Sequence, residues 1–165
     1  MSTLNQQQKL KRVRRCIWIV IIGLALSGIT AFPLETELGF INGHLTWLPL
    51  AMQQWISNIY FTLHKVNRQY PYLGYGTDWL AFAHIMLAIL FIGILKDPVK
   101  NIWVIEFGML ACVLIIPLAF IAGLIRHIPF FWRLIDCSFG VFGIIPLWVA
   151  RHLIAPPNPP LEAGL

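Results

Sequence analysis

The fold is decided by residues 102–125, IWVIEFGMLACVLIIPLAFIAGLI, an apolar run interrupted by one charged residue, Glu106. A helix of about 20 mainly apolar residues is long enough to cross the hydrocarbon core of a bilayer. Outward from this run, three more stretches carry the same pattern, at residues 16–32, 78–95 and 130–154. The sequence therefore predicts an all-α integral membrane protein. We expect a four-transmembrane-helix bundle in which residues 1–165 form a single membrane domain.

The composition points to the same class of protein. Of the 165 residues, 58% are hydrophobic and only 12% are charged, whereas about a quarter of the residues in soluble domains are charged. Such a chain has too little polar surface to cover a water-soluble domain, so lipid is its expected solvent. Cys16, Cys112 and Cys137 lie inside apolar stretches and form no CxxC pair, and we interpret them as packing residues.

Basic residues set the predicted orientation. The net charge of +5 includes a tract at residues 9–15 directly before the first span, where Lys and Arg act as a topology signal and contact anionic lipids. With both termini cytoplasmic, eight of the twelve Lys and Arg residues face the cytoplasm. We predict this orientation in a bacterial inner membrane. Nucleic-acid binding is not predicted, because no basic patch with interleaved aromatic residues occurs elsewhere.

Residues 33–77 connect the first two spans and are too many for a plain loop. Within them, apolar residues recur at helical spacing from Leu48 to Val66, and polar residues fall mostly on the other side. This pattern predicts an amphipathic helix at about residues 48–68 on the outer membrane surface. Two roles are open for this helix: an interfacial scaffold, or a lid or docking surface over a cavity. The Pro-rich tail, residues 155–165, is predicted to be disordered.

Ionisable residues inside the spans are costly in lipid and therefore need partners. Counting along the helices places His84 and Asp136 at a similar depth in the outer half of the membrane. Arg133 and Asp136 are also spaced to pair on one helix. The predicted polar cluster comprises Asp78, His84, Arg126, His127, Arg133 and Asp136. This cluster is either a structural staple between the second and fourth spans or a site that opens outward and binds a ligand.

Small residues indicate the direction in which two of these side chains point. Ala81 and Ala88 share the face of His84, and Gly140 and Gly143 share that of Asp136. Small residues let membrane helices approach closely. We therefore expect both polar side chains to face the inside of the bundle, where they could meet.

Glu106 lies in the inner third of its span. We favour an ion pair with Arg151 or Lys96 near the cytoplasmic surface. The alternative is that its carboxylate aligns with a carbonyl group that Pro117 leaves without a donor, and coordinates a cation or relays protons. Glu106 is therefore a further candidate ligand-binding residue.

No metal site is predicted, since the five histidines show none of the close spacings, such as HxxxH, that metal ligands take. Haem ligation by His84 and His127 stays open as a weaker alternative, and the cofactor is otherwise unknown. The sequence has no phosphate-binding glycine loop, GxSxG elbow or HExxH motif.

These observations favour a non-catalytic membrane component that binds a partner protein or a lipid. The alternative is a membrane-embedded enzyme acting on a lipid or other apolar substrate. In that enzyme, His84 would be the acid–base catalyst, Asp136 would orient it, and Arg126 or Arg133 would hold an anionic headgroup. A transporter or channel ranks third and would require an oligomer, because four helices are few for transport. The expected partners are membrane lipids, a membrane protein or a second copy of the chain.

Overall fold

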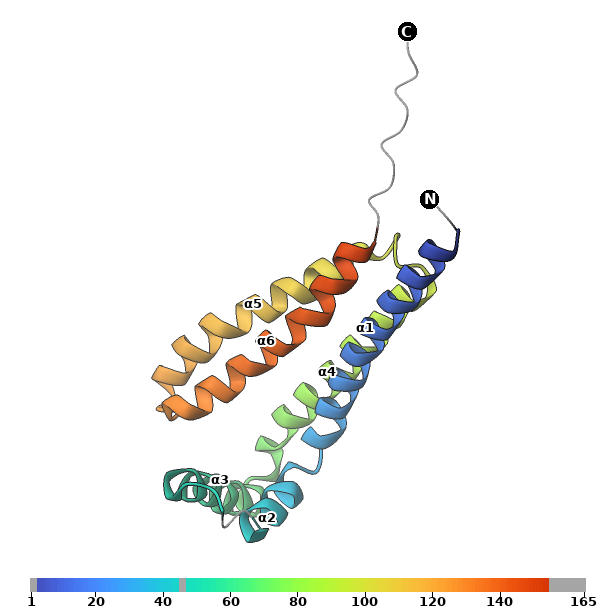
Figure 1. Cartoon of the computed structure of the whole chain (residues 1–165). Coiled ribbons are helices and arrows are strands. Elements are labelled where there is room, and N and C mark those ends of the chain that lie inside the picture. The colour runs from blue at the N-terminus through green and yellow to red at the C-terminus, as the bar shows by residue number, and fades with distance from the viewer. Residues whose placement is uncertain (1–2, 45–46, 155–165) are drawn as a thin grey trace. The chain divides into compact units, whose positions relative to one another are not determined.

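The computed structural model describes residues 3–44 and 47–154, which form helices and connecting turns and contain no strand (Figure 1). The predicted disorder of residues 155–165 lies outside the described residues. The elements, in chain order, are α1 (Thr3–Ala31), α2 (Leu34–His44), α3 (Leu50–Gln69), the short 3-10 helix η1 (Pro71–Leu73), α4 (Tyr75–Lys96), α5 (Ile102–Ile125) and α6 (Phe130–Leu153).

Four of the described helices are long and apolar enough to cross a membrane. They comprise Gln6–Ala31 of α1, Pro71–Lys96 through α4, and the whole of α5 and α6. The predicted integral membrane character and the four predicted spans are therefore confirmed. Helix α1 starts well before residue 16, since the Gln, Lys, Leu and Arg residues ahead of the span are good helix formers.

The chain divides into two compact units. The first unit comprises Met1–Ile22 and Ile89–Leu165, and the second comprises Gly23–Ala88. Both boundaries fall inside helices, one in α1 and one in α4.

In the first unit, α5 and α6 form an antiparallel pair with a close backbone approach. Gly140 of α6 lies against the backbone carbonyl oxygen of Cys112, which a side-chain Cβ at residue 140 would overlap. One turn further along, Gly143 faces the Cys112 sulfur. The expectation that the Gly140 face packs inside the protein is confirmed. The absence of a side chain is what brings the two backbones together.

The turn between α5 and α6 depends on a left-handed residue. His127 has a φ of 55°, and two hydrogen bonds close the helix end: Ile128 N–H donates to the Gly123 carbonyl (2.8 Å) and His127 N–H donates to the Leu124 carbonyl (3.2 Å). This is the Schellman arrangement, in which glycine usually occupies the left-handed position. Pro129 then precedes the first residue of α6. His127 is thus placed by the backbone turn.

In the second unit, α2 and α3 form an antiparallel helical hairpin. Asn42 accepts a hydrogen bond from the Ser57 hydroxyl, Gly39 lies against the Tyr60 ring, and Glu35 bonds to a residue further along α3. Residue numbers fall along α2 as they rise along α3, so the two helices run in opposite directions. Each helix also buries one apolar side chain, Leu38 in α2 and Ile56 in α3.

The helix predicted at about residues 48–68 is present as α3, whereas α2 was not predicted. Pro33 followed by Glu35 and Glu37 is a helix-start signal, because proline suits the first turn and carboxylates interact favourably with the helix N-terminus. Only Phe32 and Pro33 lie between the end of α1 and the start of α2.

The second unit also contains a close contact between α1 and α4. A Cβ on Gly28 of α1 would lie 2.8 Å from the carbonyl oxygen of Ala81 and 2.7 Å from the side chain of Ile85. Ala81 is fully buried and Ala88 is 4% exposed. The predicted inward direction of this face is therefore confirmed at Ala81 and Ala88, whereas His84 is half-buried.

Candidate functional site

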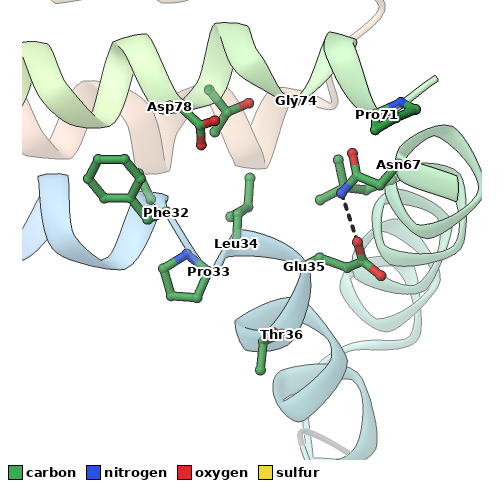
Figure 2. A pocket seen from close by; sticks show the side chains of 12 residues that line it. Phe32, Pro33, Leu34, Glu35, Thr36, Asn67, Pro71, Gly74 and Asp78 are labelled. Carbon is green, nitrogen blue, oxygen red and sulfur yellow. Dashed lines mark hydrogen bonds between the residues drawn. The ribbon is translucent and has the colours of Figure 1, made fainter.

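A cavity of about 280 Å³ lies in the second unit where four helix ends meet (Figure 2). The end of α1, the start of α2, the end of α3 and the start of α4 supply its walls. Its lining residues are Ala31, Phe32, Pro33, Leu34, Glu35, Thr36, Leu63, Asn67, Pro71, Gly74, Thr77 and Asp78. None of these side chains is basic, and two carry carboxylates.

Helix breakers place both carboxylates at the cavity. Pro33 cannot continue α1 because it lacks a backbone N–H, yet it suits the start of α2, so Glu35 falls in the first turn of that helix. The turn through Pro71 and Gly74 likewise ends at α4, with Asp78 in its first turn. A carboxylate in the first helical turn interacts favourably with the helix dipole. Local sequence therefore determines where both acids sit.

Glu35 is the most constrained residue of the site. One carboxylate oxygen lies 2.5 Å from His64 Nδ1, and the other accepts a hydrogen bond of 2.7 Å from the Asn67 side-chain amide (Figure 2). The hydrogen bonds from Asn67 and His64, together with the positive charges of His64 and Arg68, lower the pKa of Glu35 below its ordinary value of 4.5. The charged form of Glu35 is therefore the one that joins α2 to α3.

This geometry predicts an acid-sensitive hairpin. Because the folded pKa of Glu35 is depressed, its stabilising effect is fully present above the unfolded pKa near 4.5 and disappears as the pH falls through the lower folded pKa. We expect amide hydrogen exchange in α2, corrected for intrinsic rates, to speed up below pH 4.5. The Glu35→Gln variant should exchange faster at neutral pH and lose this acid-side change. Glu37→Gln, on the same helix, serves as the matched control. Identical profiles for the two variants would contradict the assignment.

The predicted cluster is distributed over both units. Asp78 and His84 belong to the second unit, and Arg126, His127, Arg133 and Asp136 belong to the first. His84 Nδ1–H donates to the Leu80 carbonyl of its own helix at 2.8 Å, which leaves Nε2 available. The His84–Asp136 acid–base pair and haem ligation by His84 and His127 both join residues of different units, and they stay predictions.

The expected pairing of Arg133 with Asp136 is wrong. Arg133 instead crosses Gly123 of α5, and its guanidinium carbon lies 5.9 Å from the centre of the Phe120 ring and 5.6 Å from that of Phe130. Helical side chains lean toward the N-terminus of their helix, which takes Arg133 away from the acid one turn later. Within the described ranges, Asp136 has neither a hydrogen bond nor an ion pair through its side chain.

Glu106 forms the predicted ion pair with Arg151. Arg151 Nε donates to a carboxylate oxygen of Glu106 at 2.8 Å, linking α5 to α6. The favoured interpretation of Glu106 is confirmed for Arg151 rather than Lys96. Its carboxylate is thus engaged in a bond between helices.

Three residues of this site were not predicted from the sequence, namely Glu35, His64 and Asn67. Pro33 and the acids after it could have indicated a helix that brings Glu35 to the surface of α3. His64 and Asn67 are three residues apart and therefore share a helical face. Their contacts with Glu35, which lies 29 and 32 residues away in the chain, have no local signature.

The arrangement is suited to binding a hydrogen-bond donor or a cation, because acceptor groups dominate its polar lining. Among the residues whose placement is described, no group of three or more His, Cys, Asp or Glu side chains could hold a metal ion. Comparison with known proteins gives no precedent: no family model, curated protein or solved structure matches this chain.

Proposed function

We propose that this chain is a non-catalytic membrane component that binds lipid through its α2–α3 hairpin. The proposal places both termini on the cytoplasmic side of a bacterial inner membrane and the hairpin in the outer interface. The observation that carries it is an apolar groove of about 390 Å³ along α3. The groove is lined by Trp55, Asn58, Ile59, Thr62, Leu63 and Val66.

Helix α3 has three faces with different surroundings. The first, with Ser57, Tyr60 and His64, contacts α2. The second is the groove. The third carries the exposed polar residues Lys65 and Arg68. An apolar face beside a basic face is the composition of helices that lie in a membrane interface, with the basic side chains near lipid phosphates.

The connections of the hairpin support this location. Only Phe32 and Pro33 separate α1 from α2, and three Cα–Cα steps of about 3.8 Å cover at most about 11 Å. Between Gln69 and Tyr75 the chain makes another short turn that contains η1. Each connection joins one end of the hairpin to a predicted span, α1 or α4. The hairpin therefore stays near the level at which those two spans leave the membrane. At this level, lipid is the molecule that we expect to contact the groove.

Site-directed spin labelling on reconstituted protein tests this proposal. Labels would replace Thr62 in the groove or Gln54 on the exposed side of the same helix, in a background without Cys16, Cys112 and Cys137. We expect the Thr62 label to be accessible to oxygen but protected from a water-soluble nickel reagent, because oxygen concentrates in lipid. The Gln54 label should show the reverse.

Two other results would contradict lipid contact. If both labels were equally accessible to nickel, the groove would face water. If the Thr62 label were protected from both reagents, protein would cover the groove, and a partner protein or a second copy would be the occupant. The Gln54 label is the internal control for folding of α3 in each case.

A further inference from the structure

The polar cavity and the apolar groove share one wall. Leu63 lines both of them, with the cavity on the side of Glu35 and Asp78 and the groove on the side of Ile59 and Val66. A polar cavity and an apolar groove that adjoin at one side chain are suited to an amphiphile, which has a polar headgroup and an apolar chain. The groove is suited to an acyl chain, and the cavity to its headgroup.

The chemistry of the cavity selects a headgroup that donates hydrogen bonds. Asn67 uses its amide nitrogen on Glu35, and its side-chain oxygen is buried without a hydrogen-bond partner. In the described part of the chain, the Asp78 carboxylate also has no hydrogen bond or ion pair. The hydroxyls of Thr36 and Thr77 can either donate or accept. The Asn67 oxygen is enclosed and Asp78 is exposed, so the acceptor that a ligand can reach is the Asp78 carboxylate. Neither a phosphate nor a carboxylate could satisfy this acceptor.

The surrounding charges agree with a cation. Glu35 is already compensated by His64 and Asn67. In the described residues the Asp78 carboxylate has no such partner, and it lies at the start of α4, where the helix dipole is equivalent to only about half a positive charge. The carbonyl end of α1, at Ala31, also lines the cavity and contributes partial negative charge. The cavity lining includes no Lys, Arg or His.

We infer that the cavity holds the primary ammonium group of a phospholipid whose acyl chain lies in the α3 groove. This inference rests on the proposed function and names its ligand class. A primary ammonium has three N–H donors for the Asp78 carboxylate, whereas a trimethylammonium group has none. The cavity should therefore distinguish ethanolamine from choline headgroups on identical acyl chains.

The test measures lipid retention by the full-length protein with native mass spectrometry. Delipidated protein is titrated with phosphatidylethanolamine or with phosphatidylcholine of the same chains, and free ethanolamine is added as a separate competitor. We expect the ethanolamine lipid to bind about tenfold more tightly, the size of effect given by one hydrogen bond to a charged group. Asp78→Asn should remove this preference. Glu37→Gln, an acid of α2 that does not line the cavity, should retain it.

The possible outcomes test separately the ammonium site, the amphiphilic ligand and the assignment to this cavity. Equal retention of the two lipids by the unaltered protein overturns the ammonium site, and this comparison needs no variant to fold. Displacement of the lipid by free ethanolamine at a similar concentration overturns the amphiphile and leaves a site for a soluble amine. A preserved preference in Asp78→Asn overturns the assignment to this cavity. A Thr62 label exposed to nickel would instead reject the proposed function, so the two failures are distinguishable.

Discussion

Gly140→Val is expected to separate α5 from α6 and to cause a large loss of stability in the first unit. The new Cβ would overlap the backbone carbonyl oxygen of Cys112, and a helix backbone cannot move aside as a flexible side chain can. Overpacking a tight contact costs about 1–3 kcal/mol, and we expect the upper end of this range because Val adds two methyl groups beyond the Cβ.

Thermal unfolding in lipid nanodiscs measures this effect. Gly23→Val is the matched control, because Gly23 also lies in a span but a Cβ there would meet nothing within 4 Å. The control should unfold close to the unaltered protein. Equal losses in both variants would show that valine lowers stability through its helix propensity, and would reject the close approach as the cause.

Asp136→Asn is expected to stabilise the protein. Asp136 precedes Gly140 by four residues and therefore shares its face, which packs on α5. Within the residues that the structure describes, no donor or cation reaches its side chain. An unpaired carboxylate in a span costs about 3 kcal/mol at the bilayer centre. Because Asp136 lies nearer one end of its span, replacing the carboxylate with an amide of equal size should gain about 1–2 kcal/mol.

The matched substitution is Glu106→Gln, which should have the opposite sign. Glu106 is also an acid in a span, but it is paired with Arg151 at 2.8 Å, and its loss leaves that arginine without its partner. Unfolding of both variants in one lipid composition gives the comparison. A loss of stability in Asp136→Asn would mean that its carboxylate has a partner. A double-mutant cycle with His84→Ala would then test the predicted pair of these two residues.

Local features of the sequence determined the spans. The free energy of moving a helix into lipid is close to a sum over its own residues, so an apolar run such as residues 102–125 identifies itself without knowledge of its neighbours. Periodicity likewise indicated α3 and the inward faces of Ala81 and Gly140. The start of α2 was also present locally, in Pro33 and the acids after it.

The candidate site depended on contacts that no local pattern contains. Glu35 meets His64 and Asn67 only because α2 and α3 run antiparallel with one particular alignment, and a shift of one turn would join other residues. Arg133 was equally spaced for Asp136, but the rings of Phe120 and Phe130 and the absence of a side chain at Gly123 decided its direction.

The sequence by itself thus determined which segments belong in lipid, because transfer into lipid depends on each residue's own chemistry. The tertiary structure alone decided which polar groups are compensated and which are not. Glu35 and Glu106 have partners, while the Asp78 and Asp136 carboxylates have none within the described residues. The physical reason is that pairing requires two atoms within about 3 Å of each other, and such a distance between residues far apart in the chain is set only when helices pack.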